Sequence, residues 1–76
     1  MNITIYTKSN CPNCVSAKQL LKSKGLAYDE YWVDANAVAM NHMAEAGIKQ
    51  MPAIYINEQY VGGLAGLQAA LKQVGL

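Results

Sequence analysis

Short runs of β-branched and aromatic residues alternate with stretches of helical periodicity along the chain. The apolar runs predict four strands, at residues 3–6, 26–33, 53–56 and 59–61. Apolar positions at helical spacing predict three helices: one from Pro12 to just before Gly25, one at 35–46 and one at 64–74. The predicted order is therefore β-α-β-α-β-β-α.

Residues typical of element ends support these boundaries. Pro12 suits the first position of a helix, where its missing N–H costs nothing. Gly25, after two lysines, is a plausible C-terminal stop, and Gly47 closes the second helix. Asp34 is the candidate N-cap of that second helix. Asn57-Glu58 predicts a two-residue turn between the last two strands.

This order predicts an α/β protein with one domain over residues 1–76. The first β-α-β unit should place its strands in parallel with a right-handed connection, and the final hairpin is antiparallel. The expected result is a four-stranded mixed sheet flanked by three helices, which lie on both faces. The first helix starts at the carboxyl end of the first strand, where ligands bind in many α/β sheets.

Composition narrows the class of protein. Of 76 residues, 53% are hydrophobic and 14% charged, which excludes disorder. No apolar run reaches the roughly 18 residues of a membrane span, and residues 1–8 do not resemble a signal peptide, so we expect a cytoplasmic protein without a membrane partner. The net charge is +1, with six dispersed lysines and no arginine, so nucleic acid is not an expected partner.

The two cysteines stand three residues apart, at Cys11 and Cys14. A disulfide between them would close too small a loop to add much stability. Zinc needs four ligands, and the spacing of His42 and the carboxylates does not complete such a site, so no metal is expected. A C-x-x-C pair beside a β-α-β pattern indicates thiol–disulfide redox chemistry.

The position of this pair predicts different roles for its members. Cys11 falls at the helix N-terminus, where free N–H groups and the helix dipole favour an anion. Lys8 adds positive potential, and both effects should lower the pKa of Cys11. We therefore expect Cys11 to be the nucleophile and Cys14, one turn further, to be the resolving thiol.

Other residues that could carry chemistry are interpreted as packing or surface residues. His42 is expected to be a surface or packing residue rather than a general base. Met40 and Met43 are expected to fill gaps in the core. Sheet packing is the interpretation for four aromatic side chains, Tyr28, Tyr31, Trp32 and Tyr55.

Three segments together resemble a dithiol glutaredoxin: Tyr6 to Cys14, Met51-Pro52 and Val61-Gly62-Gly63. The resemblance covers essentially the whole chain, in the order and spacing of that family. It implies a thioredoxin-like fold with Pro52 in the cis form, lying against the active-site cysteines. Cis peptide bonds occur almost only before proline.

The resemblance also implies glutathione as electron donor and co-substrate. Its binding residues would be Lys8, Cys11, Pro12, Met51, Pro52, Gly62 and Gly63. Met51 would pair through its backbone with glutathione or an extended peptide. Lys8 would hold the glycyl carboxylate with help from Lys49, and the Gly62-Gly63 turn would hold the γ-glutamyl end.

This sequence departs from the family at two positions. Ala65 stands where the family usually has Asp or Ser, so a side-chain contact to the γ-glutamyl group is missing. Asn13 replaces a tyrosine that is frequent between the cysteines, which opens the site.

The resemblance thus implies a monomeric, glutathione-dependent dithiol oxidoreductase. It would reduce mixed disulfides or protein disulfides in clients such as ribonucleotide reductase. Lys49-Gln50-Met51-Pro52 is also similar to glutaredoxin-like redoxins, which serve ribonucleotide reductase but receive electrons from thioredoxin reductase. A third alternative is a module that binds an iron–sulfur cluster through Cys11 and glutathione, against which Pro12 argues.

Overall fold

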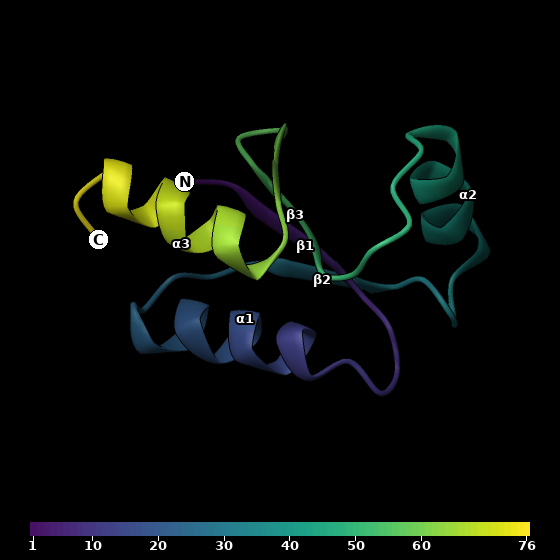
Figure 1. Cartoon of the computed structure of the whole chain (residues 1–76), viewed down its shortest axis with the longest axis horizontal. Coiled ribbons are helices and arrows are strands. Elements are labelled where there is room, and N and C mark those ends of the chain that lie inside the picture. Colours follow the sequence, from purple (N-terminus) through teal and green to yellow (C-terminus); the bar gives the residue numbers. More distant parts are fainter.

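The computed structural model describes all residues from 1 to 76 and contains the seven expected elements in the expected order (Figure 1). No helix among them is long and apolar enough to cross a membrane. The elements are β1 (Ile3–Thr7), α1 (Pro12–Ser23), β2 (Asp29–Trp32), α2 (Ala37–Glu45), β3 (Ala53–Ile56), β4 (Gln59–Gly62) and α3 (Leu64–Gln73).

The four strands form one mixed sheet in the order β2-β1-β3-β4. β1 and β2 are parallel, whereas β1–β3 and β3–β4 are antiparallel. The predicted four-stranded mixed sheet with three helices is confirmed. β1 is central, so its carboxyl end at Thr7 leads directly from the middle of the sheet into the loop before α1.

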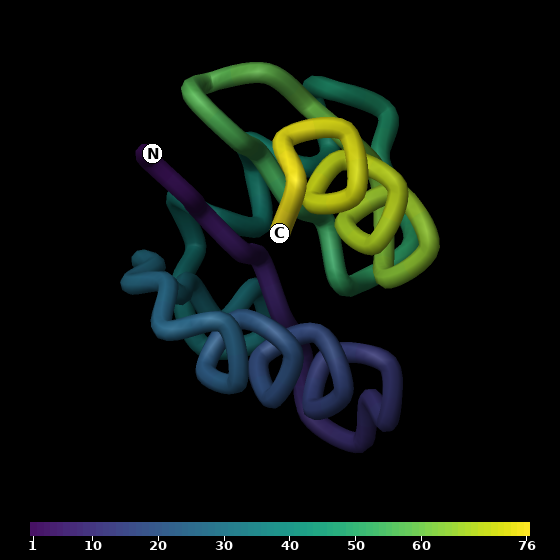
Figure 2. Tube along the Cα trace, turned by 90° about the vertical axis from the view of Figure 1, so that its left-hand side faces the viewer, coloured from purple at the N-terminus to yellow at the C-terminus, as the bar shows by residue number.

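The hydrophobic core lies between one face of the sheet and the helices α1 and α3, which run near each other (Figure 2). Alternate residues of β1 point into this core and are fully buried, as a period of two requires. Its buried members are Ile3, Ile5, Ala17, Leu21, Ile54, Leu67 and Leu71.

The opposite face of the sheet receives α2, which lies at the end of the molecule away from both termini (Figure 1). The ring of His42 stacks on Tyr6 of β1 with 5.7 Å between centroids. His42 is therefore an exposed packing residue, as expected. Met43 is buried, but the expectation for Met40 is wrong because its side chain is 52% exposed.

All three helices end in the same way. At the end of α1, Gly25 has φ 67°, its N–H bonds to the Lys22 carbonyl, and the next N–H, of Leu26, bonds to Leu21. This Schellman arrangement needs a left-handed residue, which glycine supplies without steric cost. It holds Leu26 in the helix terminus, so the strand predicted at 26–33 is shorter and begins at Asp29.

The start of α2 also differs from the prediction. The N-cap is Asn36, whose side-chain oxygen accepts a hydrogen bond of 3.1 Å from the Ala39 N–H. Asp34 is not the cap, because its carboxylate instead accepts a 3.0 Å hydrogen bond from the Ser9 N–H. The helix therefore begins at Ala37, two residues later than expected, and Asp34 anchors the loop before the cysteine pair.

Two of the aromatic side chains expected in sheet packing are substantially exposed, namely Tyr31 and Trp32. The β2 strand that carries them is at the edge of the sheet, with only β1 beside it. Burial on an edge strand is incomplete because neighbours cover it from one side only.

Candidate active site

The cysteine pair lies where the chain leaves β1 and enters α1. Asn10 turns the chain with φ 56°, and Cys11 then takes the extended conformation of an N-cap. Pro12 follows at the first helical position, as predicted from its missing N–H. A disulfide joins Cys11 and Cys14, whose Cα atoms are 5.2 Å apart. The two sulfurs are thus placed for reversible bonding.

The environments of the two sulfurs differ. The N–H of Cys14 donates to Cys11 Sγ over 3.2 Å, so Cys11 caps α1 through its sulfur. No acidic residue lies in the first turn of α1. A thiolate at Cys11 would be stabilised by this donor and by the positive end of the helix dipole. Cys11 is 9% exposed and Cys14 2%, so Cys11 is the more accessible sulfur.

The turn before β3 lies directly against Cys11. The Met51–Pro52 peptide bond is cis, and the Met51 carbonyl oxygen is 3.5 Å from Cys11 Sγ. In the disulfide, Cys11 Sγ carries no proton, so the two atoms are in contact without a hydrogen bond. In the reduced protein, the Cys11 thiol could donate a hydrogen bond to this oxygen. Pro52 is buried, whereas Met51 is partly exposed.

The turn between β4 and α3 meets the same region from the other side. A Cβ built on Gly63 would lie 3.4 Å from the Pro52 carbonyl oxygen, so the two turns are in close contact. Gly62 has φ 107°, and Gly63 is the N-cap of α3 without a side-chain capping bond. The N-terminus of α3 therefore presents unpaired backbone donors near the cis-proline turn.

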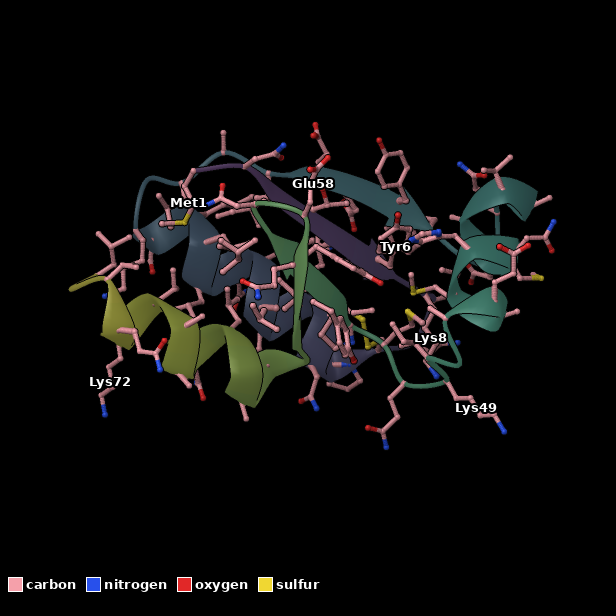
Figure 3. All side chains as sticks on the ribbon, turned by 90° about the horizontal axis from the view of Figure 1, so that it is seen from above. Met1, Tyr6, Lys8, Lys49, Glu58 and Lys72 are labelled. Atoms are coloured by element: carbon pink, nitrogen blue, oxygen red, sulfur yellow. A yellow bond between two sulfur atoms is a disulfide. The ribbon has the colours of Figure 1, made fainter.

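Two lysines lie on the α2 side of the cysteines. Lys8 and Lys49 line one surface hollow of about 420 Å³ together with Met51. Figure 3 shows both lysines at the end of the molecule that carries α2, whereas Lys72 lies at the other end. Lys8 also borders a second hollow, which contains Cys11, Pro12 and Cys14. Lys8 thus connects the cysteine pair with the α2 hollow.

A polar network around Lys18, which lines the same hollow as the cysteine pair, was not identified from the sequence. One carboxylate oxygen of Glu30, Oε2, accepts hydrogen bonds from Lys18 Nζ at 2.8 Å and from Thr7 Oγ1 at 2.9 Å. Lys18 Nζ also lies 4.9 Å from the centre of the Trp32 ring, a cation–π contact. Lys18 follows Cys14 by four residues and so lies on the same helix face. This spacing is the one feature of the sequence that could have indicated that Lys18 lies near the cysteine pair.

The pKa values of two carboxyl groups, Glu30 and Asp34, are lowered by their surroundings. Burial raises the pKa of Glu30, but the hydrogen bonds from Lys18 and Thr7 and the nearby lysine charges outweigh burial and lower it below 4.5. The pKa of Asp34 is lowered by its hydrogen bonds from Ser9. Both carboxylates are thus held ionised, and they fix strand β2 and the loop before Cys11.

Comparison with known proteins places this site in a family. The glutaredoxin family model matches residues 3–61, which include both cysteines and the cis-proline turn. The chain belongs to the glutaredoxin family. It is 41% identical to glutaredoxin 3 of Escherichia coli K12 over 76 residues, covering 99% of this chain and 92% of that protein. As a glutaredoxin with a Cys11–Cys14 pair, the protein is a thiol–disulfide oxidoreductase.

Solved structures confirm the thioredoxin-like fold. Glutaredoxin 1 of Francisella tularensis, crystallised with cacodylate, superimposes with a TM-score of 0.82 at 30% identity, covering 96% of this chain and 94% of that one. The glutaredoxin-like protein NrdH-redoxin of E. coli has a TM-score of 0.80 at 24% identity, covering 91% and 93%. The second likeness concerns the fold alone.

Proposed function

We propose that the protein is a glutathione-dependent dithiol oxidoreductase that reduces mixed and protein disulfides through Cys11 and Cys14. The observation that carries the proposal is the position of Cys11: its sulfur caps α1 and lies 3.5 Å from the Met51 carbonyl at the cis-proline turn. A thiol at this point has a stabilised anionic form and an extended backbone beside it for substrate pairing.

The reaction follows from the two sulfur environments. The Cys11 thiolate attacks one sulfur of the client disulfide, forms a mixed disulfide and releases the other client sulfur as a thiolate, which takes up a proton. Cys14, deprotonated, then attacks Cys11 Sγ and releases the second client thiol. The client disulfide has gained two electrons and two protons, and the protein is left with the Cys11–Cys14 disulfide.

Glutathione closes the cycle in this proposal. One glutathione thiolate attacks the Cys11–Cys14 disulfide at Cys11 and frees Cys14. A second glutathione attacks the glutathione sulfur of that mixed disulfide, giving oxidised glutathione and the free dithiol. The bound glutathione would pair with the Met51 backbone, place its glycyl carboxylate by Lys8 and Lys49, and direct its γ-glutamyl carboxylate to the Gly62-Gly63 turn and the start of α3.

Single-cysteine variants test the proposed roles. Cys11→Ser should abolish all exchange, since it removes the nucleophile. Cys14→Ser should retain reduction of a small glutathione mixed disulfide but lose reduction of an intramolecular protein disulfide, because it removes the thiol that resolves the Cys11 adduct within the protein. Both rates are measured by coupling to glutathione reductase and NADPH. Full activity of Cys11→Ser in either assay would overturn the assignment.

A second candidate function is favoured by the first turn of α3. That turn contains no acidic residue, and the position two residues after Gly63 is Ala65. The γ-glutamyl amine of glutathione therefore has no carboxylate partner there, which would suit a redoxin reduced by thioredoxin reductase. Ribonucleotide reductase is a proposed client in either case, and the cytosol, which keeps thiols reduced, is the proposed location.

A further inference from the structure

The hollow beside α2 contains Lys8, Lys49 and Met51, which are proposed to contact glutathione, and also apolar side chains that no proposed glutathione contact uses. Six of its lining side chains are apolar, and three of these are methionines: Val33, Met40, Met43, Ala44, Ile48 and Met51. Its volume is about 420 Å³, at the lower end of the range for small-ligand pockets. It adjoins the disulfide through Met51, whose carbonyl oxygen lies 3.5 Å from Cys11 Sγ.

The floor of this hollow is rigid because it is part of a helix terminus. Gly47 has φ 72° at the end of α2, and the Ile48 N–H bonds to the Met43 carbonyl over 2.9 Å. In such a terminus the residue after the glycine packs on the last turn of its own helix. Ile48 is half-buried and Met43 almost fully buried, so the two supply an apolar base to the hollow at this helix terminus.

The wall of the hollow, by contrast, is exposed and adaptable. Met40 precedes Met43 by one turn of α2 and leaves 52% of its surface in solvent. An unbranched thioether side chain can adjust to apolar groups of different shape. An exposed methionine over a buried apolar base is the arrangement expected of a surface that receives side chains of varied partners.

The charge around the hollow selects the kind of partner. Its only charged lining residues are Lys8 and Lys49, and Figure 3 shows both at this end of the molecule. A partner with a carboxylate next to an apolar side chain would satisfy the lysines and the methionines together.

We propose that this hollow is a client subsite that binds an aliphatic side chain next to the attacked cysteine, with a neighbouring acidic residue held by Lys8 and Lys49. The inference rests on the proposed function, since it specifies which protein disulfides this thiol–disulfide site prefers. The occupant is a peptide segment of the client. Glutathione contains no aliphatic side chain, so this subsite favours protein clients over small disulfides.

Three symmetric peptide disulfides test the subsite. Their monomers are Glu-Leu-Cys-Leu-Glu, Glu-Ser-Cys-Ser-Glu and Gln-Leu-Cys-Leu-Gln, each blocked at both ends. Identical flanks make the result independent of the direction in which the peptide binds. The measured quantity is the second-order rate constant for reduction by the reduced protein in a single turnover. Each value is divided by the uncatalysed rate with glutathione, which corrects for the reactivity of the peptide sulfur.

Burial of one leucine side chain in a half-open hollow should favour the Leu–Glu peptide over the Ser–Glu peptide by roughly tenfold. Met40→Gln should lower this ratio to about threefold or less, because it places an amide on the wall. The matched control is Val38→Gln on the same helix: Val38 is 78% exposed and does not line this hollow. Val38→Gln should keep the tenfold ratio.

A second pair of variants tests the preference of the subsite for acidic peptides. The Leu–Glu peptide should react about fivefold faster than the Leu–Gln peptide, and Lys49→Gln should remove most of this difference. Lys72→Gln, at the other end of the molecule, should leave it unchanged. Equal rates for all three peptides with the wild type would overturn the subsite and leave the oxidoreductase proposal intact. Reduction of none of them would overturn both.

Discussion

Replacing Glu30 with glutamine tests how the network of Glu30, Lys18 and Thr7 stabilises the fold. The Glu30 carboxylate oxygen accepts two short hydrogen bonds, from Lys18 and Thr7, and the ion pair is about one-fifth exposed on both sides. Charged hydrogen bonds contribute about 1.5–3 kcal/mol when buried, and exposed ion pairs about 0.2–1 kcal/mol. For this partly exposed pair we expect a loss of about 1–2 kcal/mol at pH 7.

The pH dependence of this loss has a definite sign. The pKa of Glu30 is lower in the folded protein than its ordinary value of 4.5. A carboxyl with a lowered folded pKa stabilises the protein above its unfolded pKa, and the stabilisation is lost as pH falls through the folded pKa. The difference between wild type and Glu30→Gln should therefore be full above about pH 5.5 and shrink steadily below pH 4.5.

Urea unfolding of the oxidised protein at pH 7 and at several values below pH 4.5 measures this difference. At pH 7 the expected loss corresponds to a fall in melting temperature of roughly 5–15 °C for a domain of this size. Asp29→Asn is the control, because Asp29 is an exposed carboxylate of the same strand that forms no ion pair. A Glu30→Gln loss that stays constant from pH 7 to pH 3, or a loss no larger than that of Asp29→Asn, would refute the reasoning.

Three further predictions follow from single contacts. Gly66→Ala should lower the free energy of unfolding by about 1–3 kcal/mol in urea, because the new Cβ would run into the Val61 carbonyl, whereas the same change in an open helix is stabilising. Asn36→Ala should cost about 1 kcal/mol in the same assay through loss of the α2 cap, and unchanged stability of Asn36→Ala would contradict that assignment. Lys8→Ala should weaken glutathione binding about tenfold in calorimetry, because it removes a charged partner for the glycyl carboxylate, and unchanged affinity would exclude Lys8 from the site.

The order of elements could be predicted because local signals agreed with the final packing. Alternation in Ile3 to Tyr6 and the periodicity around Leu20 and Leu21 report directly on burial. The start of β2 after Leu26 and the start of α2 after Asp34 were predicted less accurately. Leu26 is held in the local turn that ends α1, which shortens the following strand. Asp34 is drawn away from its helix by the Ser9 N–H, a tertiary contact that overrides the local preference.

Some features of the candidate site could likewise be predicted from the sequence, and others could not. The cysteine pair and the helix start at Pro12 are adjacent in sequence, so their chemistry could be inferred from spacing. Glu30 and Lys18 come together only because β2 pairs in parallel with β1 beside α1, which places Glu30 within hydrogen-bonding distance of Lys18. The exposure of Met40 depends on where α2 lies on the sheet, and no periodicity within the helix specifies that position.

In the proposed cycle, glutathione is the reductant of the Cys11–Cys14 disulfide. The most direct test compares two electron donors for the oxidised protein: glutathione with glutathione reductase and NADPH, and thioredoxin reductase with NADPH. NADPH consumption during reduction of a mixed disulfide reports turnover in each case. We predict rapid turnover with glutathione and little with thioredoxin reductase. Rapid turnover with thioredoxin reductase and none with glutathione would contradict the claim and favour the reductase-coupled redoxin.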